Sequence, residues 1–274
     1  MFFNKTIKIL RCQLWRWTFL WEVIFYLKQC ENFKEIIEAR KTGSPLDKIV
    51  LRNGLIFKIA GPTTNALCMF REVWKSKAYA RAFVGRKPDI VVDIGAHFGF
   101  FTIKAACLWP SAKIFAYEPS PRNFVILKEN VSKNKIPNIV LSNDAVAGKA
   151  GFRPFYIKNK LEADSLIHNN ASGNIAEETT QVKTTTLRHI VNSLGQQNID
   201  LLKMDCEGAE YEILESSLDI LNAYVKCLLI EIHLDMIGIN AKTPLETSIK
   251  KMGFQTVCLQ KYPPAVILLA VKKR

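Results

Sequence analysis

The sequence predicts an α/β domain with a mostly parallel sheet, preceded by a smaller helical segment. From residue 90 onwards, short apolar runs alternate with stretches of helical spacing, as βαβ units require. The runs IVVDIG and CLLIEIH are apolar almost throughout, which is typical of parallel strands covered on both faces. With 49% hydrophobic and 23% charged residues among 274, the chain can bury a full core. This composition excludes a disordered chain and a disulfide-stapled mini-protein.

Residues 1–45 are expected to form a helical extension, because apolar and aromatic side chains recur every three or four positions within residues 5–28. This helix either packs on its own chain or a second subunit, or lies in a membrane interface with its aromatic side chains down. Packing is favoured, because aromatic stripes are more often core. Arg16 and Glu22 interrupt the apolar run, so no membrane span is predicted. No small-residue cleavage site follows, which argues against a signal peptide.

Residues 46–88 are expected to lead into the main domain. A second short helix over 33–42 should end at Gly43. Two β-prone runs then flank Asn53-Gly54, which predicts a hairpin. Residues 66–83 have helical spacing.

Residues 89–274 are expected to form the main domain, with a less regular insert at about 147–186 that has strands near 152–157 and 181–186. The expected strands of the alternating pattern are 90–95, 113–119, 138–146, 199–205 and 226–233. The expected helices are 98–108, 121–134, 187–194, 208–221 and 244–252. A final antiparallel pair should flank Tyr262-Pro263-Pro264.

The net charge and the cysteine content indicate which partners and which cellular compartment to expect. The net charge of +13 attracts many kinds of anion and selects none, and residues 1–60 hold eleven Lys and Arg against five Asp and Glu. The seven cysteines include no C-x-x-C pair, so we expect reduced thiols and a cytoplasmic chain. The four histidines lie far apart, so no metal site is expected.

Ligands of an open parallel sheet collect at the carboxyl ends of its strands. The first strand ends in a D-x-G-x-x-x-G loop with Asp93, Gly95 and Gly99. An acid before the first glycine suits a cationic ligand, such as S-adenosylmethionine with its sulfonium and ammonium groups. Gly95 would let the backbone approach the ligand, and Gly99 would let the next helix pack tightly.

Two more carboxylates follow the next two strands. Glu118 stands where a carboxylate accepts two ribose hydroxyls, and Asp144 where one accepts an adenine amino group. The alternative for Glu118 is a solvated strand end.

The stretches VVDIGAHFGFFTI, IFAYEPSPRNFVILKENV, NDAV, LLKMDCEGAEYEIL and LLIEIH closely resemble the FkbM-type methyltransferase family, over roughly residues 50–235. The resemblance implies a class I Rossmann-like methyltransferase fold: a mostly parallel seven-stranded sheet with a C-terminal antiparallel hairpin. It also implies S-adenosylmethionine as cofactor and O-methylation of a hydroxyl on a sugar, glycolipid or secondary metabolite.

The resemblance assigns residues to both halves of such a site. The cofactor set it implies is Asp93, Gly95, Ala96, His97, Gly99, Glu118, Pro119, Asp144 and Ala145. His97 stands where this loop more often has Asn. Asp205, Glu207 and Glu210 fall on the acidic motif of the family.

Methylation of a neutral hydroxyl needs a base at the fourth or fifth strand end. The candidates are Asp205, Glu207 and His233, with His233 or Asp205 favoured because a neutral imidazole needs little tuning near pH 7. His233 could instead be a hydrogen-bonded strand-end histidine, and Glu207 a helix-start charge. Glu231 lies on the same face of its strand as His233. For Glu231, a structural salt bridge to Lys203 and a catalytic role are expected equally.

Two other classes of protein stay open. The basic charge favours a nucleic-acid methyltransferase, but residues 205–208 would present acidic groups to a polyanion. A non-catalytic binding module on the same fold is the second alternative. The expected partner is a small-molecule or glycan acceptor, with peripheral membrane contact through residues 5–28 as an alternative role of that helix.

Overall fold

A computed structural model describes residues 19–75, 77–83, 85, 87–157, 164–166, 178–233, 242–262 and 265–272. The chain divides into two compact units, Met1–Cys68 and Met69–Arg274. The division falls within one helix, between the boundaries predicted at residues 45 and 88.

The first unit contains the predicted helices and hairpin. Residues 19–29 are helical, while the rest of the predicted amphipathic helix lies outside the described residues. Helix α2 (Phe33–Thr42) ends at Gly43, whose φ of 75° lets its N–H bond the Ala39 carbonyl. Strands β1 (Lys48–Val50) and β2 (Ile56–Lys58) pair antiparallel around Asn53-Gly54. In the part of the chain that the structure describes, no helix is long and apolar enough to cross a membrane.

The second unit is built on a seven-stranded sheet with the order β11-β12-β10-β9-β3-β4-β5. Its strands are β3 (Ile90–Ile94), β4 (Lys113–Tyr117), β5 (Ile139–Ser142), β9 (Leu201–Met204), β10 (Cys227–His233), β11 (Phe254–Tyr262) and β12 (Ala265–Lys272). Strands β5, β4, β3, β9 and β10 run parallel, and β12 pairs antiparallel with β10 and β11. The predicted fold class is confirmed.

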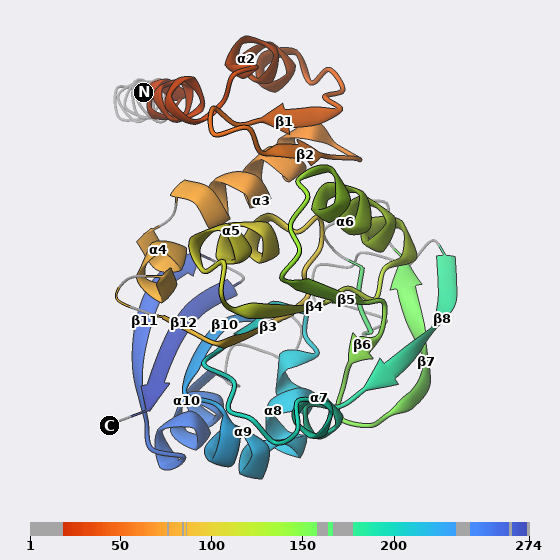
Figure 1. Cartoon of the computed structure of the whole chain (residues 1–274), viewed down its shortest axis with the longest axis vertical. Helices are drawn as coiled ribbons and strands as arrows, with labels where there is room; N and C mark the ends of the chain where they lie inside the picture. Colours follow the sequence, from red (N-terminus) through yellow and green to blue (C-terminus); the bar gives the residue numbers. More distant parts are fainter. Residues whose placement is uncertain are drawn as a thin grey trace, which may run out of the picture. The chain divides into compact units, whose positions relative to one another are not determined.

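Helices cover both faces of this sheet. Helices α5 (Phe100–Leu108) and α6 (Pro121–Lys133) lie on one side, and α7 (Leu187–Ser193), α8 (Glu210–Ser216), α9 (Leu218–Tyr224) and α10 (Lys242–Lys251) on the other (Figure 1). Every residue of β3, β9 and β10 is buried, which explains why these strands are apolar along almost their whole length.

Three predicted elements are divided in the structure. The helix expected over 66–83 is two helices, α3 (Thr63–Lys75) and α4 (Lys77–Phe83). The helix expected over 208–221 breaks at Ser217, whose φ of −130° is not helical, into α8 and α9. The strand expected over 138–146 ends at Ser142, and the chain resumes as a separate strand at Ala145, while the Asn143 side-chain amide donates to the Glu118 carbonyl at 2.7 Å.

The insert forms a sheet of its own. Strand β6 (Ala145–Val146) pairs with β8 (Glu178–Thr185), which pairs with β7 (Gly151–Ile157), in the order β6-β8-β7. The two strands predicted in the insert are thus confirmed. Residues 164–166 join this sheet through a bridge between Ser165 and Tyr156.

Candidate active site

The carboxyl ends of β3, β4 and β5 stand side by side. Residue pairing aligns Ile94 with Tyr117, and Tyr117 with Ser142. Asp93, Glu118 and Asp144 therefore lie at one edge of the sheet, as the sequence predicts. We call the edge at which β5, β4, β3, β9 and β10 end the carboxyl edge.

The loop between β3 and α5 is held by strand β4 and closely approached by strand β9. The N–H groups of Gly95 and Ala96 both donate to the Tyr117 carbonyl at 3.0 Å. Gly95 has a φ of 79°, and a Cβ atom there would overlap the Asp205 carbonyl oxygen. The expected reason for this glycine was approach to a ligand. The structure adds a second reason, because the Asp205 carbonyl after β9 fills the space that a side chain would take, and approach to a ligand stays a prediction.

Gly99 fulfils its predicted role in helix packing. It precedes α5 with a φ of 87°, and a Cβ atom would lie 2.6 Å from Cδ1 of Leu127 on α6. The absence of a side chain at residue 99 therefore allows α5 to begin against α6.

Glu118 is 5% exposed, and its carboxylate organises two backbone segments. One oxygen accepts the N–H of His97 at 2.7 Å, and the other accepts the N–H of Ser120 at 2.9 Å. Burial raises the pKa of Glu118 to about 7, although these two bonds and the nearby Lys203 act in the opposite direction. The alternative of a solvated strand end is excluded by this burial.

His97 reaches Glu118 through its backbone rather than its ring. Its φ is 51°, a left-handed conformation in which Asn and His are both enriched. The contact to Glu118 therefore does not depend on which of the two side chains is present. The His97 ring lies against Phe98, with ring centroids 4.0 Å apart.

Asp93 has a different neighbour from the one expected. Its side chain is completely buried, accepts the Thr102 hydroxyl at 2.5 Å, and lies 3.2 Å from the ammonium of Lys203. The expectation was a cationic ligand beside this carboxylate. In the structure the cation is Lys203, so Asp93 takes an indirect part in the site.

The third strand end is more open. The Asp144 carboxylate lies 3.2 Å from Nζ of Lys183, on strand β8 of the insert, and this pair is partly exposed. Ala145 is buried at the start of β6, and the Pro119 carbonyl accepts the side-chain amide of Asn143 at 3.2 Å.

A cluster of carboxylates surrounds His233 at the ends of β9 and β10. Nδ1 of His233 lies 3.1 Å from Glu210. Nε2 lies 3.7 Å from Glu207, 3.9 Å from Asp205 and 3.9 Å from Glu231. Within this cluster the Asp205 and Glu207 side chains are 30% and 27% exposed, so these two carboxylates face solvent at the carboxyl edge.

Glu210 is fully buried and holds the loop after β9. Its two carboxylate oxygens accept the N–H groups of Cys206 at 2.7 Å and of Gly208 at 2.8 Å. This loop includes Glu207, whose φ of 51° is unusual for a residue other than glycine. The bonds to Glu210 stabilise that conformation.

The surroundings of His233 contradict the premise of a neutral imidazole. Burial alone would lower its pKa, but Glu207, Glu210 and Asp205 raise it well above the usual value. These carboxylates therefore favour the protonated ring over the neutral imidazole that a base requires. Asp205 and Glu207 stay as the candidate bases.

Asp205, Glu231 and His233 each bring one ligand atom within 4.8 Å of the others, which is compatible with a bound cation. Acidic groups gather in this way in many proteins without a metal. The expectation of no metal rested on Cys and His spacing and did not weigh carboxylates, so it stays a prediction.

Three site residues escaped the sequence analysis. Lys203 interrupts an apolar strand, and this signal could have marked it as more than a partner for Glu231. Asp164 accepts Ser120 Oγ at 2.9 Å and pairs with Arg122, which ties the insert to the residues after β4. Neither Asp164 nor Thr102 had a signal, because their partners are distant in the sequence.

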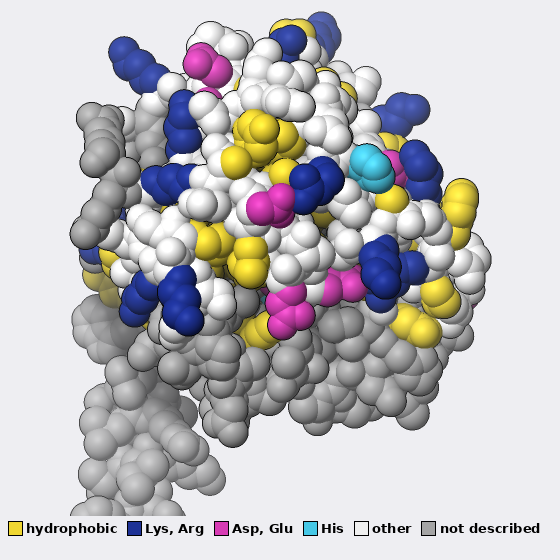
Figure 2. All heavy atoms as spheres, turned by 90° about the horizontal axis from the view of Figure 1, so that it is seen from below, with side chains coloured by type: hydrophobic (Ala, Val, Ile, Leu, Met, Phe, Trp, Pro, Cys, Tyr) yellow, Lys and Arg dark blue, Asp and Glu magenta, His cyan; other side chains and the backbone are white. Residues whose placement is uncertain are grey.

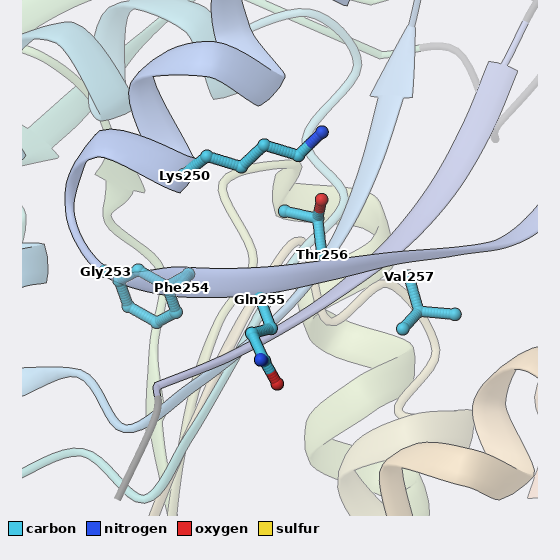
Figure 3. Close-up of a pocket in the computed structure, with 6 residues that line it drawn as sticks. All are labelled: Lys250, Gly253, Phe254, Gln255, Thr256 and Val257. Atoms are coloured by element: carbon cyan, nitrogen blue, oxygen red, sulfur yellow. The ribbon is translucent and has the colours of Figure 1, made fainter.

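A separate hollow of about 580 Å³ lies where α10 meets β11, lined by Lys250, Gly253, Phe254, Gln255, Thr256 and Val257 (Figure 3). Phe254 pairs with Lys272, and Val271 pairs with Cys227 at the start of β10. The hollow is therefore at the edge of the sheet opposite to the carboxyl edge.

On the face seen from below Figure 1, Lys and Arg side chains stand apart, with acidic and hydrophobic side chains between them (Figure 2).

The sheet order and its antiparallel C-terminal strand define a class I methyltransferase fold. The sequence profile described as the methyltransferase FkbM domain matches residues 93–255. The chain belongs to the FkbM methyltransferase family and is a methyltransferase, as the resemblance implied. The match begins at Asp93 and extends beyond residue 235.

Two relatives and one solved structure show a distant similarity to this chain. The 31-O-demethyl-FK506 methyltransferase FkbM of Streptomyces tacrolimicus is 25% identical over 60% of this chain and 74% of its own length. The hexuronic acid methyltransferase AglP of Haloferax volcanii is 26% identical over 60% of this chain and 66% of its own length. The crystal structure of a methyltransferase FkbM from Methylobacillus flagellatus has 13% identity and a TM-score of 0.47, covering 76% of this chain and 52% of that one.

Proposed function

We propose that this chain transfers a methyl group from S-adenosylmethionine to a hydroxyl on a sugar, glycolipid or secondary metabolite. The observation that carries the proposal is the Glu118 carboxylate, buried at the end of β4 and bonded to the loop after β3. S-adenosylmethionine supplies a methyl group bonded to a positively charged sulfur.

The residues at the ends of β3, β4 and β5 fit such a nucleoside. Each Glu118 oxygen accepts one backbone N–H and keeps a second lone pair, so the carboxylate can still accept two ribose hydroxyls. Asp144, at the end of the neighbouring strand, would accept the adenine amino group. Gly95, Ala96, His97 and Gly99 would shape the backbone on the other side of the nucleoside.

The ends of β9 and β10 fit the chemistry of a hydroxyl acceptor. We propose Asp205 as the base that removes the hydroxyl proton, with Glu207 as the alternative, because both carboxylates are partly exposed. Nε2 of His233 lies within 4 Å of both carboxylates.

The proposed acceptor class has two supports. The printed names of two relatives specify methylation of 31-O-demethyl-FK506 and of a hexuronic acid, both of which are molecules with hydroxyl groups. In this chain the two exposed groups of the His233 cluster are carboxylates, which repel anions. We therefore favour a neutral hydroxyl compound over a uronic acid or a phosphorylated sugar.

Exposed apolar side chains on helix 19–29 support a second proposal, peripheral membrane contact through the predicted helix within residues 5–28. Trp21 is 60% exposed, and Leu20 and Leu27 are also exposed. Flotation of the whole chain and of a chain lacking residues 1–30 with anionic liposomes tests this role. Equal flotation of the two would contradict it.

The deciding experiment for the function is transfer of labelled methyl from S-adenosylmethionine into fractionated cell extract, followed by identification of the labelled species. We expect label in a small hydroxylated molecule or glycan. Label in RNA or DNA would instead support a nucleic-acid methyltransferase, which the charge of +13 favours. A chain that binds no S-adenosylmethionine would support a non-catalytic module.

A further inference from the structure

We propose that Lys203 is a positioning residue that holds the loop after β3 and the candidate base Asp205 in one fixed arrangement. This inference rests on the proposed function, because it assigns Lys203 a part in cofactor binding and in placing the base.

Lys203 contacts both halves of the site. Its side chain is 5% exposed, and its ammonium nitrogen donates to the Gly95 carbonyl at 2.7 Å. The same nitrogen lies 3.2 Å from the Asp93 carboxylate and 3.5 Å from the Asp205 carboxylate. An ammonium has three N–H donors, and here three oxygens surround it.

Asp93 holds the Lys203 ammonium in position. The two residues are paired across β3 and β9, so their side chains leave the sheet on the same face. Asp93 is fully buried and is itself held by the Thr102 hydroxyl. Thr102 and Asp93 therefore fix the ammonium, and the ammonium fixes the Gly95 carbonyl and Asp205.

The buried position of residue 203 does not by itself require the ion pair between Asp93 and Lys203. Leu201, Leu202 and Met204, the other residues of β9, are all buried and apolar. Replacing a buried ion pair with apolar residues of similar volume is often neutral or stabilising. A lysine here adds what an apolar side chain cannot, a bond to the Gly95 carbonyl and a positive charge beside Asp205.

Gly95 and Asp205 belong to different parts of the proposed reaction. Gly95 begins the loop whose N–H groups reach Tyr117 and Glu118, on the cofactor side. Asp205 follows β9 directly, on the acceptor side. In the described part of the chain, Lys203 is thus placed to set the distance between the nucleoside site and the base.

The test separates positioning of the loop by Lys203 from neutralisation of the Asp93 charge by Lys203. The change Lys203→Met alone would leave a buried carboxylate without its cation, so we combine it with Asp93→Asn. We expect the double variant to unfold within a few degrees of the wild type. Its dissociation constant for S-adenosylhomocysteine, measured by calorimetry, should rise at least tenfold, and by more than in Asp93→Asn alone, which keeps the Lys203 bond to the Gly95 carbonyl.

A second ion pair, away from the carboxyl edge, serves as the control. Lys226 and Asp200 pair at 2.7 Å just before β10 and β9, at the opposite edge of the sheet. The double change Asp200→Asn with Lys226→Met should leave the dissociation constant unchanged.

A second variant covers the case in which the first double variant does not fold. Lys203→Arg keeps the charge beside Asp93, but its planar guanidinium cannot reproduce the contacts of an ammonium to three oxygens. We expect a dissociation constant at least threefold higher than that of the wild type. Affinity equal to the wild type in every folded Lys203 variant would overturn the inference, whereas a wild type that binds no S-adenosylhomocysteine would refute the proposed function itself.

Discussion

The two halves of the carboxyl edge use their carboxylates differently. At the ends of β3 and β4, Asp93 and Glu118 are buried, and their oxygens are bonded to backbone N–H groups, a hydroxyl and a lysine. At the end of β9, Asp205 and Glu207 are partly exposed and lie beside His233. The first half is built to hold backbone in place, and the second presents charged oxygens to solvent.

This difference teaches how one edge of a sheet can bind one molecule and act on another. Carboxylates that are fixed by several hydrogen bonds are suited to positioning, because they cannot turn without breaking those bonds. A partly exposed carboxylate can exchange protons with an acceptor at little cost. Changes in the two halves should therefore have separable effects.

The largest expected effect comes from the place where the two halves touch. Gly95→Ala would put a methyl group into the Asp205 carbonyl, at a left-handed φ of 79°. Overpacking and the unfavourable φ together should cost about 4 kcal/mol of unfolding free energy. Gly253→Ala is the matched control, because Gly253 has a φ of 81° and nothing within 4 Å of its Cβ position. Chemical denaturation of both variants would measure the difference, and equal losses would contradict the close approach.

In the exposed half, Asp205→Asn should leave binding of S-adenosylhomocysteine within a few-fold and slow methyl transfer by about a hundredfold or more, because the amide cannot accept the proton. Glu207→Gln should have a smaller effect if Asp205 is the base. Glu215→Gln, an exposed change on α8, is the control. Unchanged turnover in Asp205→Asn together with a large loss in Glu207→Gln would exchange the two roles.

In the buried half, Glu118→Ala should weaken binding of S-adenosylhomocysteine by at least about ten- to a hundredfold, since the loss of even one hydrogen bond to a charged group costs about 1.5–3 kcal/mol. Glu129→Ala on α6 is the matched control, because Glu129 pairs with Lys133 on the helix surface. Calorimetry measures both. Equal affinity in the two variants would remove Glu118 from the cofactor site.

The smallest expected effect is a dependence of cofactor affinity on pH. The folded pKa of Glu118 is about 7, above its ordinary value of 4.5, so this carboxyl is mostly protonated below pH 7. A protonated carboxyl must lose its proton before it accepts two hydroxyls. Affinity should therefore fall as the pH drops below 7, by at most about tenfold per pH unit. Binding curves at several pH values should show this slope in the wild type and not in Glu118→Gln.

Sequence periodicity was sufficient for the sheet and insufficient for the contacts within the site. The strands and most helices follow from apolar runs and turn residues, and Asp93, Glu118 and Asp144 were located because strand ends of a parallel sheet share an edge. Periodicity does not show where an element is interrupted, such as the break between β5 and β6 at Asn143 and Asp144. It also did not show the four carboxylates around His233, because they come from β10 itself and from the loop and helix after β9.

The central claim is that adenosine binds at the ends of β3, β4 and β5, and a crystal structure with S-adenosylhomocysteine tests it most directly. We expect both ribose hydroxyls within hydrogen-bond distance of Glu118, with the sulfur directed toward Asp205. A nucleoside bound elsewhere, for instance in the hollow beside Phe254 and Thr256, with Glu118 unchanged, would contradict the account.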